Sequence, residues 1–202
     1  MSHIIKHLSK DPVLKKLIIT FPDVLNEWEN LQNEKRDIFV AIARTIVNQQ
    51  LSVKAAATIW GRVSELVGEL SPENILKHDR EEYRSAGMSY AKSDYLISLA
   101  NDVVDNTFKT SILHDLSNEE VEKELTKLKG IGPWSAEMIM MFTLHRPDVF
   151  SIGDMGLKNA VSTLYNVDKN NEEEIIAISQ KWSPYRTIAC MYLWKSLDNT
   201  PS

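Results

Sequence analysis

The chain has 202 residues, of which 43% are hydrophobic and 25% are charged, and its formal net charge is −5 at pH 7. A chain of this length and composition can form one domain or two small lobes, and no apolar run is long enough to span a membrane. The single cysteine, Cys190, excludes an internal disulfide and a four-cysteine zinc or iron–sulfur site. The acidic balance argues against a broad basic surface. We therefore expect a soluble intracellular protein.

Helix-start signals recur through the first half of the chain. Asp11-Pro12 predicts a cap followed by a first-turn proline, with a helix through Ile19, and Ser71-Pro72 repeats this pattern. Apolar residues at helical spacing over 39–47 predict one buried helix face, and Ser52 caps the helix that follows. These signals predict several short helices joined by tight turns.

Capping boxes continue the same pattern. Asp79 with Glu82, and Ser117 with Glu120, are each spaced so that the two side chains can satisfy each other's backbone N–H groups, and Ser89 caps a further helix. In the second half we expect helices over about 133–144 and 155–165 and two more near the C-terminal end. No convincing segment shows the period-two alternation of a strand, so the sequence predicts an all-α fold.

The run LKGIGPWSA at 128–136 is the most informative segment of the chain. Its two glycines permit a tight turn and a close backbone approach, and Pro133 suits the first turn of the next helix. Backbone N–H groups at that helix start form an anion site, and Lys127 and Lys129 bracket the turn. The segment predicts a helical hairpin that binds a nucleic-acid phosphate without reading sequence.

Five blocks in a fixed order carry a resemblance to a known family: IVNQQLS at 46–52, AGM at 86–88, the hairpin at 128–136, DVFSIGD at 148–154, and WSPYR at 182–186 leading to Trp194. With these blocks the chain resembles the helix-hairpin-helix (HhH-GPD) base-excision DNA glycosylases, specifically the 3-methyladenine DNA glycosylase II group. The resemblance implies an all-α, two-lobed fold with a central cleft. One lobe is expected over about 38–146, and the other over 1–37 together with 147–202.

The resemblance also implies an activity. A monomeric, monofunctional glycosylase would hydrolyse the N-glycosidic bond of alkylated bases, of the 3-methyladenine and 7-methylguanine type, after flipping the nucleotide out of duplex DNA. The catalytic carboxylate would be Asp154. A single acid suffices because an alkylated base is already cationic and leaves with little protonation, so the carboxylate only has to stabilise charge on the sugar or direct water. From spacing alone, Asp154 is an ordinary helix N-cap, and the two roles can coexist.

Aromatic residues are implied around the flipped base. Trp134 stands where lyase-active relatives carry a lysine nucleophile, and an indole cannot form a Schiff base. Trp194 and Tyr185 would attract a cationic base through cation–π interactions, and Met138 stands where a relative has an aromatic pocket residue. Plain packing is the alternative for Trp134.

Further residues are implied in DNA binding. The hairpin would contact phosphate through Lys129, Gly130, Ile131 and Gly132, while Gln50, or its neighbour Leu51, would fill the gap left by the flipped nucleotide. An interhelical turn facing water is the alternative for that segment. No cofactor is required, although the hairpin is expected to hold a monovalent cation through the backbone carbonyls of Thr126, Leu128 and Ile131.

Two rival functions remain open at this point. One is a non-catalytic helix-hairpin-helix DNA-binding protein, against which Asp154, Trp134 and Trp194 count because phosphate binding needs none of them. The other is a glycosylase for other damaged or mismatched bases, which the missing cysteine cluster and the missing lysine at position 134 disfavour.

Overall fold

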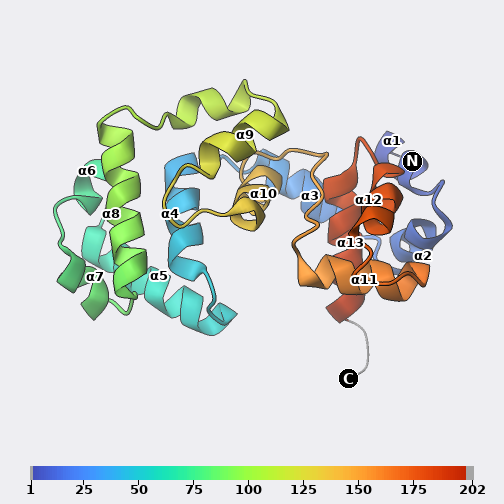
Figure 1. The fold of residues 1–202 in the computed structure, drawn as a ribbon, viewed down its shortest axis with the longest axis horizontal. Coiled ribbons are helices and arrows are strands. Elements are labelled where there is room, and N and C mark those ends of the chain that lie inside the picture. Colours follow the sequence, from blue (N-terminus) through green and yellow to red (C-terminus); the bar gives the residue numbers. More distant parts are fainter. Residues whose placement is uncertain (1, 199–202) are drawn as a thin grey trace. The chain divides into compact units, whose positions relative to one another are not determined.

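The computed structural model describes residues 2–198, and over this range it contains helices and no strand (Figure 1). The elements are α1 (His3–Leu8), α2 (Pro12–Thr20), α3 (Val24–Asn33), α4 (Ile38–Asn48), α5 (Val53–Val67), α6 (Pro72–Ile75), α7 (Arg80–Ser85), α8 (Tyr90–Val104), the 3-10 helix η1 (Thr110–His114), α9 (Asn118–Leu125), α10 (Pro133–Phe142), α11 (Met155–Tyr165), α12 (Glu172–Gln180) and α13 (Arg186–Asp198). The prediction of an all-α fold is confirmed. Within 2–198, none of these helices has the length and apolar character needed to cross a membrane.

The predicted helix starts are capped as their residue types require. Asp11 accepts hydrogen bonds from the N–H groups of Val13 and Leu14 at 2.9 and 3.1 Å. Both capping boxes are complete, since the Glu82 and Glu120 side chains each return to the N-cap backbone N–H at 2.8 Å. Caps of this kind stabilise a helix by about 1 kcal/mol each.

The chain forms two compact units. Unit 1 comprises residues 1–35 and 140–202, and unit 2 comprises residues 36–139. The second boundary falls inside α10, earlier than the expected position after residue 146, because the end of this helix packs into unit 1, where the Phe142 ring lies 5.9 Å from that of Trp194.

Unit 1 is organised around α13. This helix packs against α2, α3 and α11, so the N-terminal segment and the C-terminal quarter share one core. Trp28 and Trp182 are fully buried there, and the Trp182 indole N–H donates to Asp11 at 3.2 Å. These two tryptophans therefore pack the core of unit 1.

Unit 2 is organised around α4 and α8, which lie side by side (Figure 1). The buried face of α4 includes Ile42, Ile46 and Val47, and α8 contributes Leu96 and Leu99. This burial follows the helical spacing predicted for 39–47, and each such side chain contributes about 1.5–3 kcal/mol of hydrophobic stabilisation. Helices α6 and α7 cover the other side of α8.

The N-terminal residues are more ordered than the sequence indicates. Because His3 and His7 lie near the chain end, the sequence predicts a frayed segment with both histidines at the surface. In the structure Ser2 caps α1, and the His7 ring packs edge-on against Tyr185 at 5.5 Å. The surface prediction is therefore wrong for His7, which is half-buried with its Nε2 shielded from solvent. The predicted helix from Pro133 ends at Phe142 rather than near Leu144.

Candidate functional site

The glycine hairpin connects α9 to α10 in unit 2. Leu128 and Ile131 are buried and anchor the turn, and the Ile131 N–H donates to the Leu128 carbonyl at 3.1 Å. Gly130 has a φ of +84°, and a Cβ there would lie 2.3 Å from the Tyr95 ring. This position therefore requires glycine for two reasons: its positive φ and the close approach of an aromatic ring.

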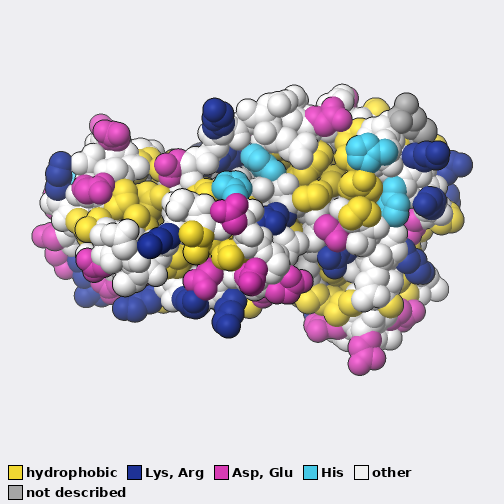
Figure 2. Space-filling view, turned by 90° about the horizontal axis from the view of Figure 1, so that it is seen from above, with side chains coloured by type: hydrophobic (Ala, Val, Ile, Leu, Met, Phe, Trp, Pro, Cys, Tyr) yellow, Lys and Arg dark blue, Asp and Glu magenta, His cyan; other side chains and the backbone are white. Residues whose placement is uncertain are grey.

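The tip of this hairpin is open. Gly132 is exposed, and no atom lies within 4 Å of where its Cβ would be, so a phosphate can approach its backbone closely. Lys129 is exposed beside the turn, whereas Lys127 pairs with Glu124 at 2.6 Å. Figure 2 shows basic and acidic side chains interspersed on the face it displays, without one broad basic field. Phosphate binding would thus depend on a few local groups, mainly the helix start and Lys129.

A second exposed turn of unit 2 joins α4 to α5. Gln50 is exposed at its tip with a φ of +55°, a left-handed conformation that is uncommon for any residue but glycine. Leu51 is half-buried, and Val53 is 89% exposed at the start of α5. Of the two residues considered for the gap-filling role, the structure presents Gln50 to solvent more fully.

Asp154 lies at the N-cap of α11 in unit 1. Its Oδ1 accepts hydrogen bonds from the Leu157 N–H at 2.8 Å and from the Trp194 indole N–H at 3.0 Å. A Cβ on Gly156 would lie 3.0 Å from the same oxygen and 3.4 Å from the Trp194 ring. The N-cap role that spacing predicts is thus present, and the carboxylate is also fixed by a donor 40 residues away in the chain.

The segment leading to Asp154 is fastened to the start of α13. The Arg186 guanidinium donates to both carboxylate oxygens of Asp148, at 2.7 and 3.1 Å, and the Ser183 hydroxyl adds a bond at 2.8 Å. Burial alone raises the pKa of Asp148, but these donors outweigh it, and the pKa of Asp148 lies below its ordinary value. Thr187 donates through its hydroxyl to the Arg146 carbonyl at 2.6 Å.

Each unit carries part of the predicted base pocket. Trp134 and Met138 are four residues apart on α10 in unit 2, which places them on one helix face; Trp134 is 45% exposed. In unit 1, Trp194 contacts Asp154 and lies against Phe142. Tyr185, also in unit 1, packs on His3 and His7 of α1.

Sequence reasoning did not find three residues that shape these elements. Phe142 lies against Trp194, and Gln49 and Lys92 hold the α4–α5 turn through side-chain hydrogen bonds. Their partners are distant in the chain, and two of the bonds end on backbone carbonyls, which leave no pattern in a single sequence. The motif NQQ at 48–50 points to this turn but does not distinguish the residue that anchors it from the residue that it exposes.

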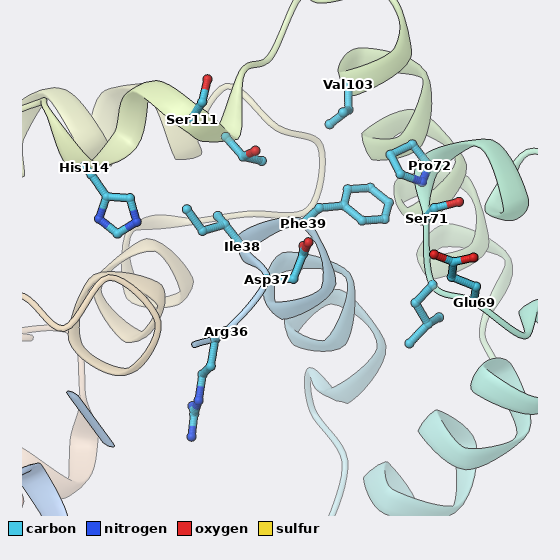
Figure 3. Close-up of a pocket in the computed structure, with 12 residues that line it drawn as sticks. Arg36, Asp37, Ile38, Phe39, Glu69, Ser71, Pro72, Val103, Ser111 and His114 are labelled. Carbon is cyan, nitrogen blue, oxygen red and sulfur yellow. The ribbon is translucent and has the colours of Figure 1, made fainter. Parts of the chain in front are cut away.

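A cavity of about 470 Å³ lies elsewhere in unit 2 and contains none of the predicted site residues (Figure 3). It is bordered by the starts of α4 and α6, the end of α8, and η1. Asp37 and Ser71 in its wall cap α4 and α6, respectively. Among residues 2–198, no three His, Cys, Asp or Glu side chains are grouped so as to hold a metal ion.

Comparison with known proteins identifies the family. The model of the "HhH-GPD superfamily base excision DNA repair protein" matches residues 43–184, which include both turns and Asp154. The chain belongs to the HhH-GPD superfamily. Within it, the chain falls in the group of the 3-methyladenine DNA glycosylases.

Several relatives within this superfamily are similar over most of the chain. DNA-3-methyladenine glycosylase 1 of Schizosaccharomyces pombe is 34% identical over 85% of this chain and 77% of its own. A solved structure of a 3-methyladenine DNA glycosylase of that organism, in complex with abasic DNA, has a TM-score of 0.78 at 30% identity and covers 98% of this chain and 97% of its own. The DNA-3-methyladenine glycosidase of Bacillus halodurans has a TM-score of 0.76 at 34% identity, over 94% and 90% of the two chains. The chain spans 57–59% of the length of two curated Bacillus subtilis relatives.

Proposed function

We propose that this chain is a monofunctional DNA glycosylase that removes alkylated bases from duplex DNA and so initiates base excision repair. The observation that carries the proposal is the carboxylate of Asp154, fixed at a helix start by the Trp194 indole N–H, in a chain that also presents the glycine hairpin. The names of the relatives from Schizosaccharomyces pombe and Bacillus halodurans, which are DNA-3-methyladenine glycosylases or glycosidases, support the substrate class. Phosphate binding by the hairpin does not involve this carboxylate, whose other role is to cap α11.

The chemistry needs little from the protein beyond this carboxylate. A base methylated on a ring nitrogen is cationic, and it leaves with the electron pair of the glycosidic bond as a neutral base. Positive charge then develops on the sugar, where the negative charge of Asp154 stabilises it and water adds to C1′ with loss of a proton. Two hydrogen bonds to Oδ1 hold the carboxylate in place throughout.

The strand stays intact in this reaction. Trp134 occupies the position of the lysine nucleophile in lyase-active relatives, and its indole cannot form a Schiff base with the sugar. The product is therefore an abasic site that breaks only in alkali. The half-exposed Trp134 ring, with Met138 on the same helix face, would contact the flipped base, and the Trp194 and Tyr185 rings would add attraction for its positive charge.

The hairpin would bind a phosphate of the same strand. Carbonyl oxygens suit a monovalent cation, and the Leu128 carbonyl, which accepts one hydrogen bond from Ile131, retains a lone pair for it. The Gly130 carbonyl is directed to Gln49 instead, so Thr126, Leu128 and Ile131 remain the ligand set that we propose. Such an ion would add positive charge at the place where the hairpin binds the phosphate. The protein would act as a monomer inside the cell, where its substrate is.

A duplex oligonucleotide with one 7-methylguanine tests the proposal. After incubation with the protein, the labelled strand should break at the lesion only when alkali is added, and an unmethylated duplex should stay intact. Strand breaks without alkali would contradict the monofunctional mechanism. Binding without any breaks would favour a hairpin protein without glycosylase activity or a glycosylase for another damaged base.

A further inference from the structure

The two exposed turns of unit 2 are linked by hydrogen bonds that begin at Lys92. This residue lies in the first turn of α8, and its Nζ donates to the carbonyls of Val47 and Gln49, at 2.9 and 2.5 Å. Those carbonyls lie at the C-terminal end of α4, where the C=O groups of the last turn have no N–H partners within the helix. The ammonium group therefore fixes the backbone that enters the turn, one residue before Gln50.

The charge of Lys92 suits this position. The C-terminal end of a helix carries partial negative charge, which stabilises an ammonium group there. The same ammonium group gives both carbonyls a hydrogen-bond donor. Lys92 is half-buried, and burial lowers its pKa. Replacement by an apolar side chain would leave two carbonyls unpaired next to Gln50, whose φ of +55° needs the support of its surroundings.

Gln49 extends the link to the hairpin. Its backbone carbonyl accepts from Lys92, while its side-chain Nε2 donates to the Gly130 carbonyl at 2.7 Å and to the Ser135 hydroxyl at 3.4 Å. Gly130 and Ser135 lie on the two sides of the hairpin tip. One residue thus joins the backbone of the first turn to the backbone of the second.

Helix α8 also contacts the hairpin directly. Tyr95 is three residues after Lys92 and so lies on the same side of the helix, and its ring occupies the space that a side chain on Gly130 would need. The first two turns of α8 therefore contact both elements, the α4–α5 turn through Lys92 and the hairpin through Tyr95.

We propose that Lys92 and Gln49 are positioning residues for nucleotide flipping: they hold the Gln50 turn at a fixed distance from the hairpin, so that phosphate binding by the hairpin brings Gln50 into the duplex at the neighbouring nucleotide. This inference rests on the proposed function. Neither residue contacts DNA in this account, and both act through Gln50. Loss of either would impair flipping and leave the chemistry at Asp154 intact.

Two substrates separate flipping from chemistry. In one duplex 7-methylguanine is paired with cytosine, and in the other it lies opposite an abasic-site analogue, where less pairing has to be broken. For Lys92→Met we expect single-turnover release to fall roughly 10- to 100-fold on the paired duplex, as a misplacement of about 1 Å can cost. On the unpaired duplex we expect release within about threefold of the wild type, because flipping there costs less.

Further variants distinguish a defect in flipping from a defect in folding. Gln49→Leu should show the same difference between substrates, and Lys92→Arg should recover part of the loss because a guanidinium can still donate to both carbonyls. Lys77→Met removes an exposed lysine of unit 2 whose side chain bonds the nearby Asn74, so its rates should match the wild type. Circular dichroism and thermal melting identify any variant that is not folded.

The outcomes are distinct. A selective loss on the paired duplex supports the inference, whereas equal losses on both duplexes by folded variants, or no loss on either, would overturn it. If the wild type releases no base at all, the proposed function fails instead. In that case 2-aminopurine fluorescence beside an abasic site still tests insertion of the Gln50 turn, and an unchanged signal for Lys92→Met would overturn the role of Lys92.

Discussion

The hairpin of unit 2 and the carboxylate site of unit 1 are built in opposite ways. In the hairpin the functional groups are mainly backbone groups, with Lys129 beside them, and side chains such as Tyr95 and Gln49 fix the position of the turn. At Asp154 the functional group is a side chain, and it is held by a helix N-terminus and by Trp194 from a distant helix. Substitutions at the hairpin tip should therefore weaken DNA binding, whereas substitutions at Asp154 should slow catalysis.

The largest effect is expected for Asp154→Asn. The amide oxygen can still accept from Leu157 and Trp194, so the fold and DNA affinity should be retained, but the negative charge is gone. We expect release of alkylated base to fall by roughly 10²–10³-fold, as for the loss of one well-placed electrostatic group. Single-turnover assays measure this, and release at the wild-type rate would remove Asp154 from its proposed role.

The matching change in unit 2 is Gly132→Asp. Because the space around this glycine is empty, the variant should fold, but its charge would oppose a phosphate at the hairpin. We expect affinity for duplex DNA to fall by roughly tenfold, equivalent to about 1.4 kcal/mol. Gly61→Asp, at another open glycine of unit 2, is the control. Fluorescence anisotropy gives both affinities, and equal values for the two variants would contradict the assignment of the hairpin.

Within unit 1, Trp194→Phe separates the hydrogen bond to Asp154 from the packing of the ring. The ring that lies against Phe142 is largely kept, while the N–H that donates to Asp154 is lost. A hydrogen bond to a charged group contributes about 1.5–3 kcal/mol, so we expect a decrease in kcat of roughly tenfold or more with little change in KM. A change in KM alone would show that Trp194 contributes through stacking rather than through the carboxylate.

The smallest effect on catalysis is expected for Asp148→Asn. This variant should instead lower the free energy of unfolding. The folded chain lowers the pKa of Asp148, so its contribution to stability is complete above the ordinary pKa of an aspartate, about 3.9, and is lost as the pH falls further. At pH 7 the variant should lose about 1–3 kcal/mol of unfolding free energy. Urea titrations should show this difference shrinking below about pH 4.

A surface ion pair supplies the control for that measurement. Asp94 pairs with Arg80 at 3.0 Å, but both side chains are 50% exposed, so Asp94→Asn should cost about 0–1 kcal/mol. A difference between wild type and Asp148→Asn that does not depend on pH would show that Asp148 stabilises unit 1 without its charge.

The fold followed largely from local signals in the sequence. Caps such as Asp11 and Ser117, and the glycines of the hairpin, act on neighbouring residues, so a single sequence displays them. The indole N–H of Trp194 on Asp154 and the ammonium of Lys92 on the end of α4 join segments about 40 residues apart. Such contacts exist only after folding, and the residue types alone do not indicate them. The resemblance placed Trp194 in the base pocket beside Asp154, and the structure added the hydrogen bond from its indole N–H to the carboxylate.

Release of free bases from methylated DNA is the decisive test of alkylbase glycosylase activity. Duplex DNA treated with a methylating agent is incubated with the wild-type chain, and the bases set free are separated by chromatography. We expect free 3-methyladenine and 7-methylguanine, no free normal base above background, and strands that remain whole until alkali is added. Methylated DNA that is bound but releases no base would contradict the assignment of glycosylase activity to this chain.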